Sequence, residues 1–161
     1  MKSLHICTRT AVSKTIKRHG VTHVLSLTDA DKRPFLHPSF NKVNWLWLKF
    51  EDVLDAKDYY APSPEHVQTI LEWGSRLPSD AVLLVHCEAG VSRSTATALA
   101  LLVQERGVDQ IDQCVEYLLS VRPQACPNPL ITLYADQQLG CGGRLHAASE
   151  EVAKKAVAKY L

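Results

Sequence analysis

Five residues separate a cysteine from an arginine near the middle of the chain, and a serine follows the arginine directly. The stretch reads His86-Cys87-Glu88-Ala89-Gly90-Val91-Ser92-Arg93-Ser94. A cysteine thiolate is a strong nucleophile, and nearby cations or a helix N-terminus favour it by lowering the thiol pKa. The planar arginine guanidinium can hold two oxygens of one phosphate group. The pattern therefore predicts a nucleophile, Cys87, beside an oxyanion-binding group, Arg93.

The flanking segments predict how this stretch is held. Residues 81–85 form an unbroken apolar run, typical of a buried strand, and residues 95–103 are typical of a buried helix. A loop that leads from a strand into a helix N-terminus presents backbone N–H groups to an anion. Gly90 permits a tight turn and a close approach to the anion. The residues expected to bind phosphate in this way are Glu88, Ala89, Gly90, Val91, Ser92 and Arg93.

The full pattern resembles the signature of the Cys-dependent protein tyrosine phosphatase superfamily, in its small dual-specificity-like branch of bacterial type. The resemblance extends from about Val21 to about Leu139. It implies attack by Cys87 and a cysteinyl-phosphate intermediate, with no metal and no other cofactor. Ser94 would donate a hydrogen bond to the departing sulfur, and His86 would order the loop from behind.

The resemblance also implies a general acid on a loop upstream of the nucleophile. Three aspartates are candidates: Asp52, Asp55 and Asp58. The spacing usual in dual-specificity phosphatases favours Asp55 or Asp58, whereas Asp52 directly follows the strand-like residues 45–50. We choose Asp52, with Asp55 as the alternative, and interpret the remaining carboxylates as a solvated loop.

A second likeness lies downstream, where Pro127-Asn128 precedes another predicted helix. Dual-specificity phosphatases carry a similar Pro-Asn, often with an arginine shortly before it, but here Ala125 and Cys126 occupy that place. Asn128 is expected to cap its helix, which by itself is worth about 1 kcal/mol. A bracing contact with the phosphate loop is a second role open to it.

Composition bounds the class of protein. The chain has 161 residues, 46% hydrophobic content and a net charge of +1, which is consistent with one domain over residues 1–161. We interpret the basic excess in residues 1–50 as a solvated helix face and predict no nucleic-acid partner. No apolar run approaches the length of a membrane span and the N-terminus does not resemble a signal peptide, so we expect a cytoplasmic protein without membrane contact.

The odd count of five cysteines fits reduced thiols, although Cys7 or Cys126 could form a disulfide with Cys87 after oxidation.

Strand and helix patterns alternate along the chain. Because such alternation is typical of an α/β fold, we predict a mostly parallel central sheet of about four or five strands flanked by helices on both faces. The strands are expected over residues 4–7, 23–27, 43–50 and 81–86. Helices are expected over residues 11–19, 63–76, 128–140 and 147–160. Two more are expected between the second and third of these: one follows the Cys87 loop and ends at Gly107, and the next runs from a cap at Asp109 to residue 121. Residues 29–41 are expected to form a loop, and residues 141–161 a C-terminal helical tail.

The leading hypothesis is a phosphomonoesterase acting on a phosphorylated protein or peptide, with phosphotyrosine preferred and dual specificity possible. The positions between Cys87 and Arg93 carry no basic residue and one acidic residue, Glu88, which disfavours a multiply charged inositol lipid. A phosphoprotein-binding module and a phosphatase of a small phosphoester are the alternatives. An arsenate reductase or sulfurtransferase is a third class, and the oligomeric state is open.

Overall fold

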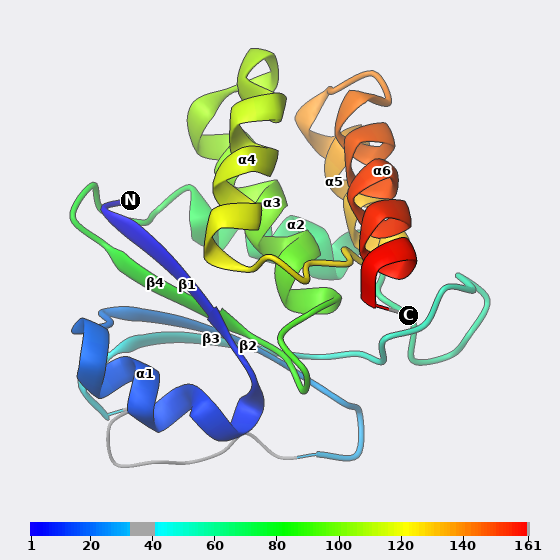
Figure 1. The fold of residues 1–161 in the computed structure, drawn as a ribbon. Coiled ribbons are helices and arrows are strands. Elements are labelled where there is room, and N and C mark those ends of the chain that lie inside the picture. Colours follow the sequence, from blue (N-terminus) through cyan, green and yellow to red (C-terminus); the bar gives the residue numbers. More distant parts are fainter. Residues whose placement is uncertain (33–40, 161) are drawn as a thin grey trace.

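Four parallel strands form the sheet in a computed structural model that describes residues 1–32 and 41–160. Their order across the sheet is β1-β4-β2-β3 (Figure 1). The strands are β1 (Ser3–Cys7), β2 (His23–Thr28), β3 (Asn44–Lys49) and β4 (Val82–His86). Every pairing between these strands is parallel, so the α/β fold with a parallel sheet is confirmed. Residues 33–40, within the loop expected over 29–41, lie outside the described residues.

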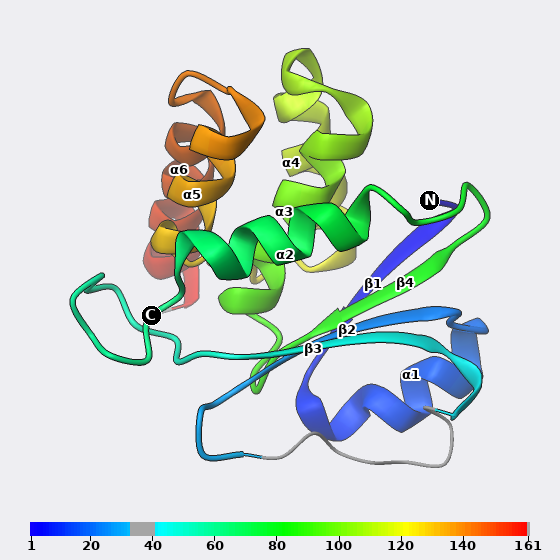
Figure 2. The same ribbon diagram turned by 180° about the vertical axis from the view of Figure 1, so that it is seen from behind.

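Helices cover the two faces of the sheet unequally, as the two opposite views show (Figures 1 and 2). Of the described α-helices, only α1 (Val12–His19) lies on one face. The opposite face carries α2 (Pro64–Gly74), α3 (Arg93–Arg106), α4 (Ile111–Val121), α5 (Pro129–Leu139) and α6 (Arg144–Tyr160). A parallel sheet must bury both faces, and accordingly all five residues of β4 are buried.

The core has two parts, one on each face of the sheet. Leu25, Leu83 and Leu99 belong to the larger cluster under the five helices. Val24 and Leu84 belong to the smaller cluster under α1. Successive side chains of a strand point to opposite faces of the sheet. The consecutive apolar residues of β2 and β4 therefore contribute to the two clusters in turn.

The helix ends follow the local signals in the sequence. Ser63 caps α2 by accepting a hydrogen bond from the backbone N–H of His66 at 3.2 Å. The glycines expected to close α1 and α5, Gly20 and Gly140, adopt φ angles of 62° and 67°, a left-handed conformation that glycine adopts without strain.

The predicted cap at Asp109 is wrong. A short 3₁₀ turn over Val108–Gln110 comes first, and α4 begins only at Ile111. Asp109 therefore lies inside the turn instead of at the non-helical position from which a side chain caps a helix. Its carboxylate pairs with Arg144 of α6 at 3.3 Å.

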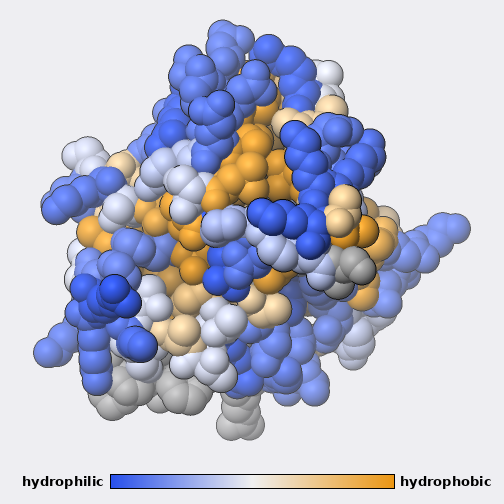
Figure 3. Space-filling view, viewed as in Figure 1, coloured by the Kyte–Doolittle hydropathy of each residue, from blue (hydrophilic) through white to orange (hydrophobic). Residues whose placement is uncertain are grey.

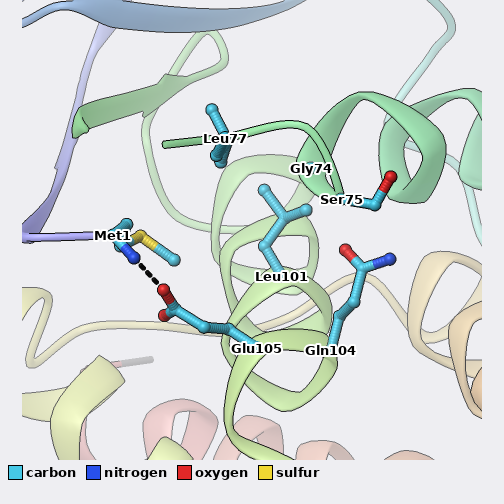
Figure 4. A pocket seen from close by; sticks show the side chains of 7 residues that line it. All are labelled: Met1, Gly74, Ser75, Leu77, Leu101, Gln104 and Glu105. Carbon is cyan, nitrogen blue, oxygen red and sulfur yellow. Dashed lines mark hydrogen bonds and ion pairs between the residues drawn. The ribbon is translucent and has the colours of Figure 1, made fainter. Parts of the chain in front are cut away.

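Gly74 allows α2 to pack closely on α3. A Cβ atom at Gly74 would lie 2.3 Å from Leu101 Cδ2 and 2.8 Å from Gln104 Oε1. A cavity of about 310 Å³ adjoins this contact, where the amino group of Met1 pairs with Glu105 (Figure 4). It lies at the amino-terminal edge of the sheet, away from the strand ends that would hold a ligand in such a fold. Of the described helices, none combines the length and apolar character needed to cross a membrane.

Candidate active site

Cys87 lies at the carboxyl edge of the sheet, directly after β4 and before α3, which begins at Arg93. Residues 88–92 form the loop between these two elements, here called the phosphate loop. The neighbouring strands β1 and β2 end beside it, because β4 lies between them. Open parallel sheets bind ligands beyond the carboxyl ends of their strands, so the fold places Cys87 where a ligand is expected.

The five carbonyl groups of the phosphate loop all accept hydrogen bonds from residues outside it. Because N–H and C=O point in opposite directions in a trans peptide, these bonds turn the loop amides toward its centre. Such convergent amides form an anion-binding nest. These bonds include Arg9 N to Glu88 O (3.1 Å), Arg122 Nη2 to Ala89 O (3.0 Å), Arg122 Nε to Gly90 O (2.7 Å), Cys126 N to Val91 O (2.9 Å) and Asn128 N to Ser92 O (3.3 Å).

Gly90 is required by two features of this loop. Its φ angle is 64°, in the left-handed region that other residues adopt at a cost. A Cβ atom here would also lie 2.6 Å from the backbone oxygen of Cys7. The end of β1 therefore presses against the loop at a point where only a hydrogen atom fits.

Cys87 is buried, with 3% of the residue exposed, and its sulfur lies against the phosphate loop. Its thiol donates to Ser94 Oγ over 3.2 Å, and the Gly90 N–H donates to the sulfur over 3.3 Å. The first turn of α3 therefore brings Ser94 to the Cys87 sulfur. A hydroxyl and an amide at the sulfur are groups that can stabilise a thiolate by hydrogen bonding.

Arg93 is buried, with 3% exposure, and two neighbours hold its guanidinium. Nη1 donates to the Phe50 carbonyl over 2.7 Å, and Nη2 pairs with Asp29 Oδ1 over 2.8 Å. Within residues 1–32 and 41–160, no group bonds to its buried Nε. A buried donor without a partner is costly, and an oxyanion in the loop would provide that partner.

Asp29 is a site residue that the sequence analysis missed. Burial acts to raise the pKa of Asp29, but hydrogen bonds and charges from Lys32 and Arg93 outweigh it and lower the pKa. Lys32 pairs with Asp29 at 3.1 Å and with Glu88 at 3.5 Å. The signal was its position, since Asp29 follows β2 directly at the carboxyl edge of the sheet.

Of the three candidate acids, Asp52 is the one that contacts the phosphate loop. Its Oδ1 accepts hydrogen bonds from Ser92 Oγ at 2.7 Å and from Asn128 Nδ2 at 2.9 Å. The carboxylates of Asp55 and Asp58 instead accept local backbone bonds within their own loop, each at 2.9 Å. Asp52 is exposed to solvent, so water has access to it beside the phosphate loop.

Asn128 joins three parts of the site, although it is fully buried. Its Oδ1 caps α5 by accepting from the N–H groups of Leu130 at 3.0 Å and Ile131 at 3.3 Å. Its Nδ2 donates to Asp52 and to the Val53 carbonyl, and its backbone N–H donates to Ser92 O. One side chain thus caps a helix and positions the loop that carries Asp52.

His86 supports the loop from behind. It is 2% exposed, and burial lowers the pKa of its imidazole from 6.5 to about 4, so the ring is neutral near pH 7. Its Nδ1 lies 3.4 Å from the Cys87 carbonyl and its Nε2 lies 2.6 Å from Ser26 Oγ. Because a carbonyl only accepts, Nδ1 carries the proton and Nε2 accepts from Ser26. Ser26 in turn accepts from Trp45 Nε1 at 2.8 Å, so the chain of donors runs from the edge strand β3 to the backbone of Cys87.

All five cysteines are free thiols. Cys7 packs in the cluster under α1, whereas Cys87 packs in the cluster on the opposite face of the sheet. Burial raises the pKa of the Cys7 thiol, which disfavours the reactive thiolate form. The charge of Cys87 nevertheless contributes to the pKa of Cys7, so the two thiols lie near each other and their disulfide stays a prediction. Cys126 stays an open candidate.

Comparison with known proteins agrees with this geometry. Residues 4–135 match the family described as "Dual specificity phosphatase, catalytic domain". The chain belongs to this family. A curated relative, Protein-tyrosine-phosphatase MKP1 of Arabidopsis thaliana, is 29% identical over 136 residues, which are 82% of this chain and 15% of the relative. The chain spans less than half the length of the first curated relatives it matches.

Solved structures show the same fold. Human DUSP28 is 24% identical with a TM-score of 0.63, and the match covers 85% of this chain and 88% of that one. A mouse putative dual specificity phosphatase complexed with zinc tungstate is 25% identical with a TM-score of 0.62, covering 90% and 86%. The likeness of these two chains supports the arrangement of strands and helices described above.

Within this dual specificity phosphatase domain, Arg122 is the second residue whose part was missed. No contact of this side chain was predicted from the sequence. Its side chain is 32 residues from Gly90 in sequence and donates to two carbonyls of the phosphate loop. No local pattern predicts such a contact, because a long side chain at a helix end can bond to many acceptors.

Proposed function

We propose that this chain is a Cys-dependent protein phosphatase that hydrolyses phosphotyrosine without a metal, with phosphoserine and phosphothreonine as the further substrates of a dual-specificity enzyme. One observation carries the proposal. The sulfur of Cys87 lies inside a loop whose five carbonyls are all bonded outward, beside an Arg93 Nε that has no partner among the described residues. Nucleophile, convergent amides and a free guanidinium donor together suit a tetrahedral phosphate group.

In the first step the Cys87 thiolate attacks phosphorus. A sulfur–phosphorus bond forms, and the bond from phosphorus to the substrate oxygen breaks. Asp52, as its carboxylic acid, gives its proton to the departing oxygen, while the loop amides and Arg93 stabilise the charge on the phosphoryl oxygens. The contacts of Asp52 with Ser92 and Asn128 support its choice over Asp55.

In the second step Asp52, now a carboxylate, removes a proton from water. The water oxygen bonds to phosphorus, the sulfur–phosphorus bond breaks, and inorganic phosphate leaves. The hydroxyl of Ser94, 3.2 Å from the sulfur, donates a hydrogen bond to the departing thiolate. His86 takes no proton in this scheme, because its buried ring only orients the Cys87 carbonyl.

A phosphoprotein is favoured as substrate over an inositol lipid. Glu88 is the charged residue of the phosphate loop itself, and Lys32 is engaged by both Glu88 and Asp29. A multiply phosphorylated head group would meet little free positive charge there. Relatives named as protein or MAP kinase phosphatases support the same choice.

We also propose that residues 1–161 act as one phosphatase domain, with 141–161 as its C-terminal helical tail. Leu145 and Val152 of α6 share the core cluster of Leu99 in α3, which supports this unit. The free thiols at all five cysteines support a cytoplasmic location.

The test is release of inorganic phosphate from para-nitrophenyl phosphate in the presence of EDTA. Cys87→Ser should abolish turnover and still bind tungstate, because the loop amides remain. Cys114→Ser, which removes another buried thiol from α4, is the matched control and should retain activity. Turnover by Cys87→Ser would rule out the thiophosphate intermediate, and loss of wild-type activity on chelation would contradict the metal-free mechanism.

A further inference from the structure

Two adjoining hollows lie beside the phosphate loop along the last turns of α6. One, of about 510 Å³, is lined by residues that include Ser92, Leu54, Cys126 and Val157. The other, of about 520 Å³, is lined by residues that include Val91, Cys126, Val157 and Tyr160. Cys126 and Val157 line both hollows, so the two are neighbours, and together they are here called the α6 groove. Figure 3 shows apolar side chains around the C-terminal end of α6 and between α4 and α6.

The α6 groove concentrates the exposed apolar surface of the molecule. Leu54 is 72% exposed, and Val157 and Tyr160 are each 49% exposed. These are three of the five large hydrophobic side chains that stand exposed in the described part of the chain. Single exposed apolar residues are ordinary, but a contiguous group around a hollow marks a binding surface.

Charged residues at the border of the groove are engaged within α6 itself. Lys154 pairs with Glu151 at 2.8 Å, and Glu150 lies 3.8 Å from His146 Nε2. The ammonium group of Lys154 is therefore already paired and is not free to attract a second phosphate. The surface therefore suits an apolar side chain more than a second phosphate.

The groove is continuous with the proposed catalytic site. Val91 and Ser92 line it and also belong to the phosphate loop. On the other wall, Leu54 stands two residues after Asp52, whose carboxylate is bonded to Ser92. An extended peptide advances about 3.3–3.6 Å per residue, so a substrate held at Cys87 would lay its next residues along this surface.

We propose that the α6 groove binds an apolar side chain that flanks the phosphorylated residue of a protein substrate, within about three residues of it. This inference rests on the proposed function and adds to it a specificity surface formed by Leu54, Val157 and Tyr160. The preferred substrate is then a phosphorylated segment with a leucine-like neighbour, not an acidic one. Binding energy would come from burial of that neighbour.

The experiment compares two phosphotyrosine peptides, one with leucines and one with aspartates at the flanking positions. Wild type should favour the leucine peptide by about tenfold in kcat/KM, mainly through KM, as burial of one aliphatic side chain allows. Val157→Lys should abolish the preference while hydrolysis of para-nitrophenyl phosphate, which is too small to reach the groove, stays unchanged. Leu54→Ser, on the facing wall of the groove, should weaken the preference for the leucine peptide as well.

Ala147→Lys is the matched control, since it adds the same charge to an exposed position of α6 about 15 Å along the helix. It should keep the wild-type preference. Affinity of the two peptides for Cys87→Ser, followed by fluorescence polarisation, measures the groove without turnover. Equal affinities of Cys87→Ser for the two peptides, or a preference that survives Val157→Lys, would refute the role of the groove in substrate choice. Neither result would contradict the proposed phosphatase activity. Sedimentation that shows a dimer broken by Val157→Lys, with peptide preference intact, would assign the groove to self-association instead.

Discussion

Acid should destabilise this protein through one buried imidazole, that of His86. The ring is 2% exposed, and burial lowers its pKa from 6.5 to about 4. Between these two values the unfolded chain binds a proton at His86 that the folded chain does not. Stability therefore falls as the pH drops from about 6.5 to about 4, and it changes no further through this group below that range.

The size of the effect follows from the two pKa values. Each pKa unit is worth about 1.4 kcal/mol, so a pKa lowered from 6.5 to about 4 corresponds to a loss of about 3 kcal/mol at pH 4. Small domains are stable by about 5–15 kcal/mol, so this loss is a large fraction of the total. Burial also lowers the pKa of His5, His23 and His66, and these groups act in the same direction.

The assay is urea unfolding of wild type and His86→Gln between pH 7 and pH 4. Glutamine does not titrate, so the variant should lose about 3 kcal/mol less than wild type across this range. His146→Gln, which changes an imidazole of α6 near the surface, controls for loss of a histidine as such. An NMR titration of wild type should show the His86 ring neutral down to about pH 4.

Equal pH dependence in wild type and His86→Gln would refute the assignment of His86 as a buried neutral ring. It would also remove the basis for the direction of the hydrogen bonds, in which Ser26 donates to Nε2 and Nδ1 donates to the Cys87 carbonyl. A charged His86 would have to donate from both nitrogens, and Ser26 would then need another acceptor.

Two further predictions concern the loops around Cys87. Asp52→Asn should slow hydrolysis of phosphotyrosine peptides far more than that of para-nitrophenyl phosphate, whose leaving group needs little protonation. Asp55→Asn should change neither rate. The reverse pattern in the two variants would make Asp55 the acid. Gly90→Ala should lower both kcat and stability, because its Cβ would meet the Cys7 backbone oxygen at 2.6 Å. The control is Gly20→Ala, at a similar φ of 62° but in open space. It should lower the free energy of unfolding in urea by only about 1 kcal/mol and leave kcat unchanged. Equal losses of stability in the two variants would show that the close approach of Cys7 to Gly90 is unimportant.

Features that depend on neighbours in sequence were predictable. The order strand, Cys87 loop, helix follows from adjacent apolar runs, and the caps at Ser63 and Asn128 follow from a polar residue placed before a proline. Asp109 shows the limit of the same reasoning. A short 3₁₀ turn lies between Gly107 and α4, so the helix begins later than a cap at Asp109 would require. The pattern of capping residues alone does not show that such a turn is present.

Contacts between distant segments were not predictable. Asp29 and Arg122 each reach the phosphate loop or its arginine from another element, and the partners depend on how strands and helices pack. The position of Asp29 after β2 carried a usable hint, since carboxyl ends of parallel strands meet at one edge. Arg122 had none, because its acceptors are backbone carbonyls that any loop possesses.

The phosphate loop is thus shaped from outside. Its carbonyls are bonded to residues outside the loop, among them Arg9, Arg122, Cys126 and Asn128, and these bonds turn its amides toward the centre. Asn128 adds a helix cap and a bond to Asp52. Loss of that side chain would therefore free a helix end and the proposed acid together, so stability and activity are coupled at a residue that need not contact the substrate.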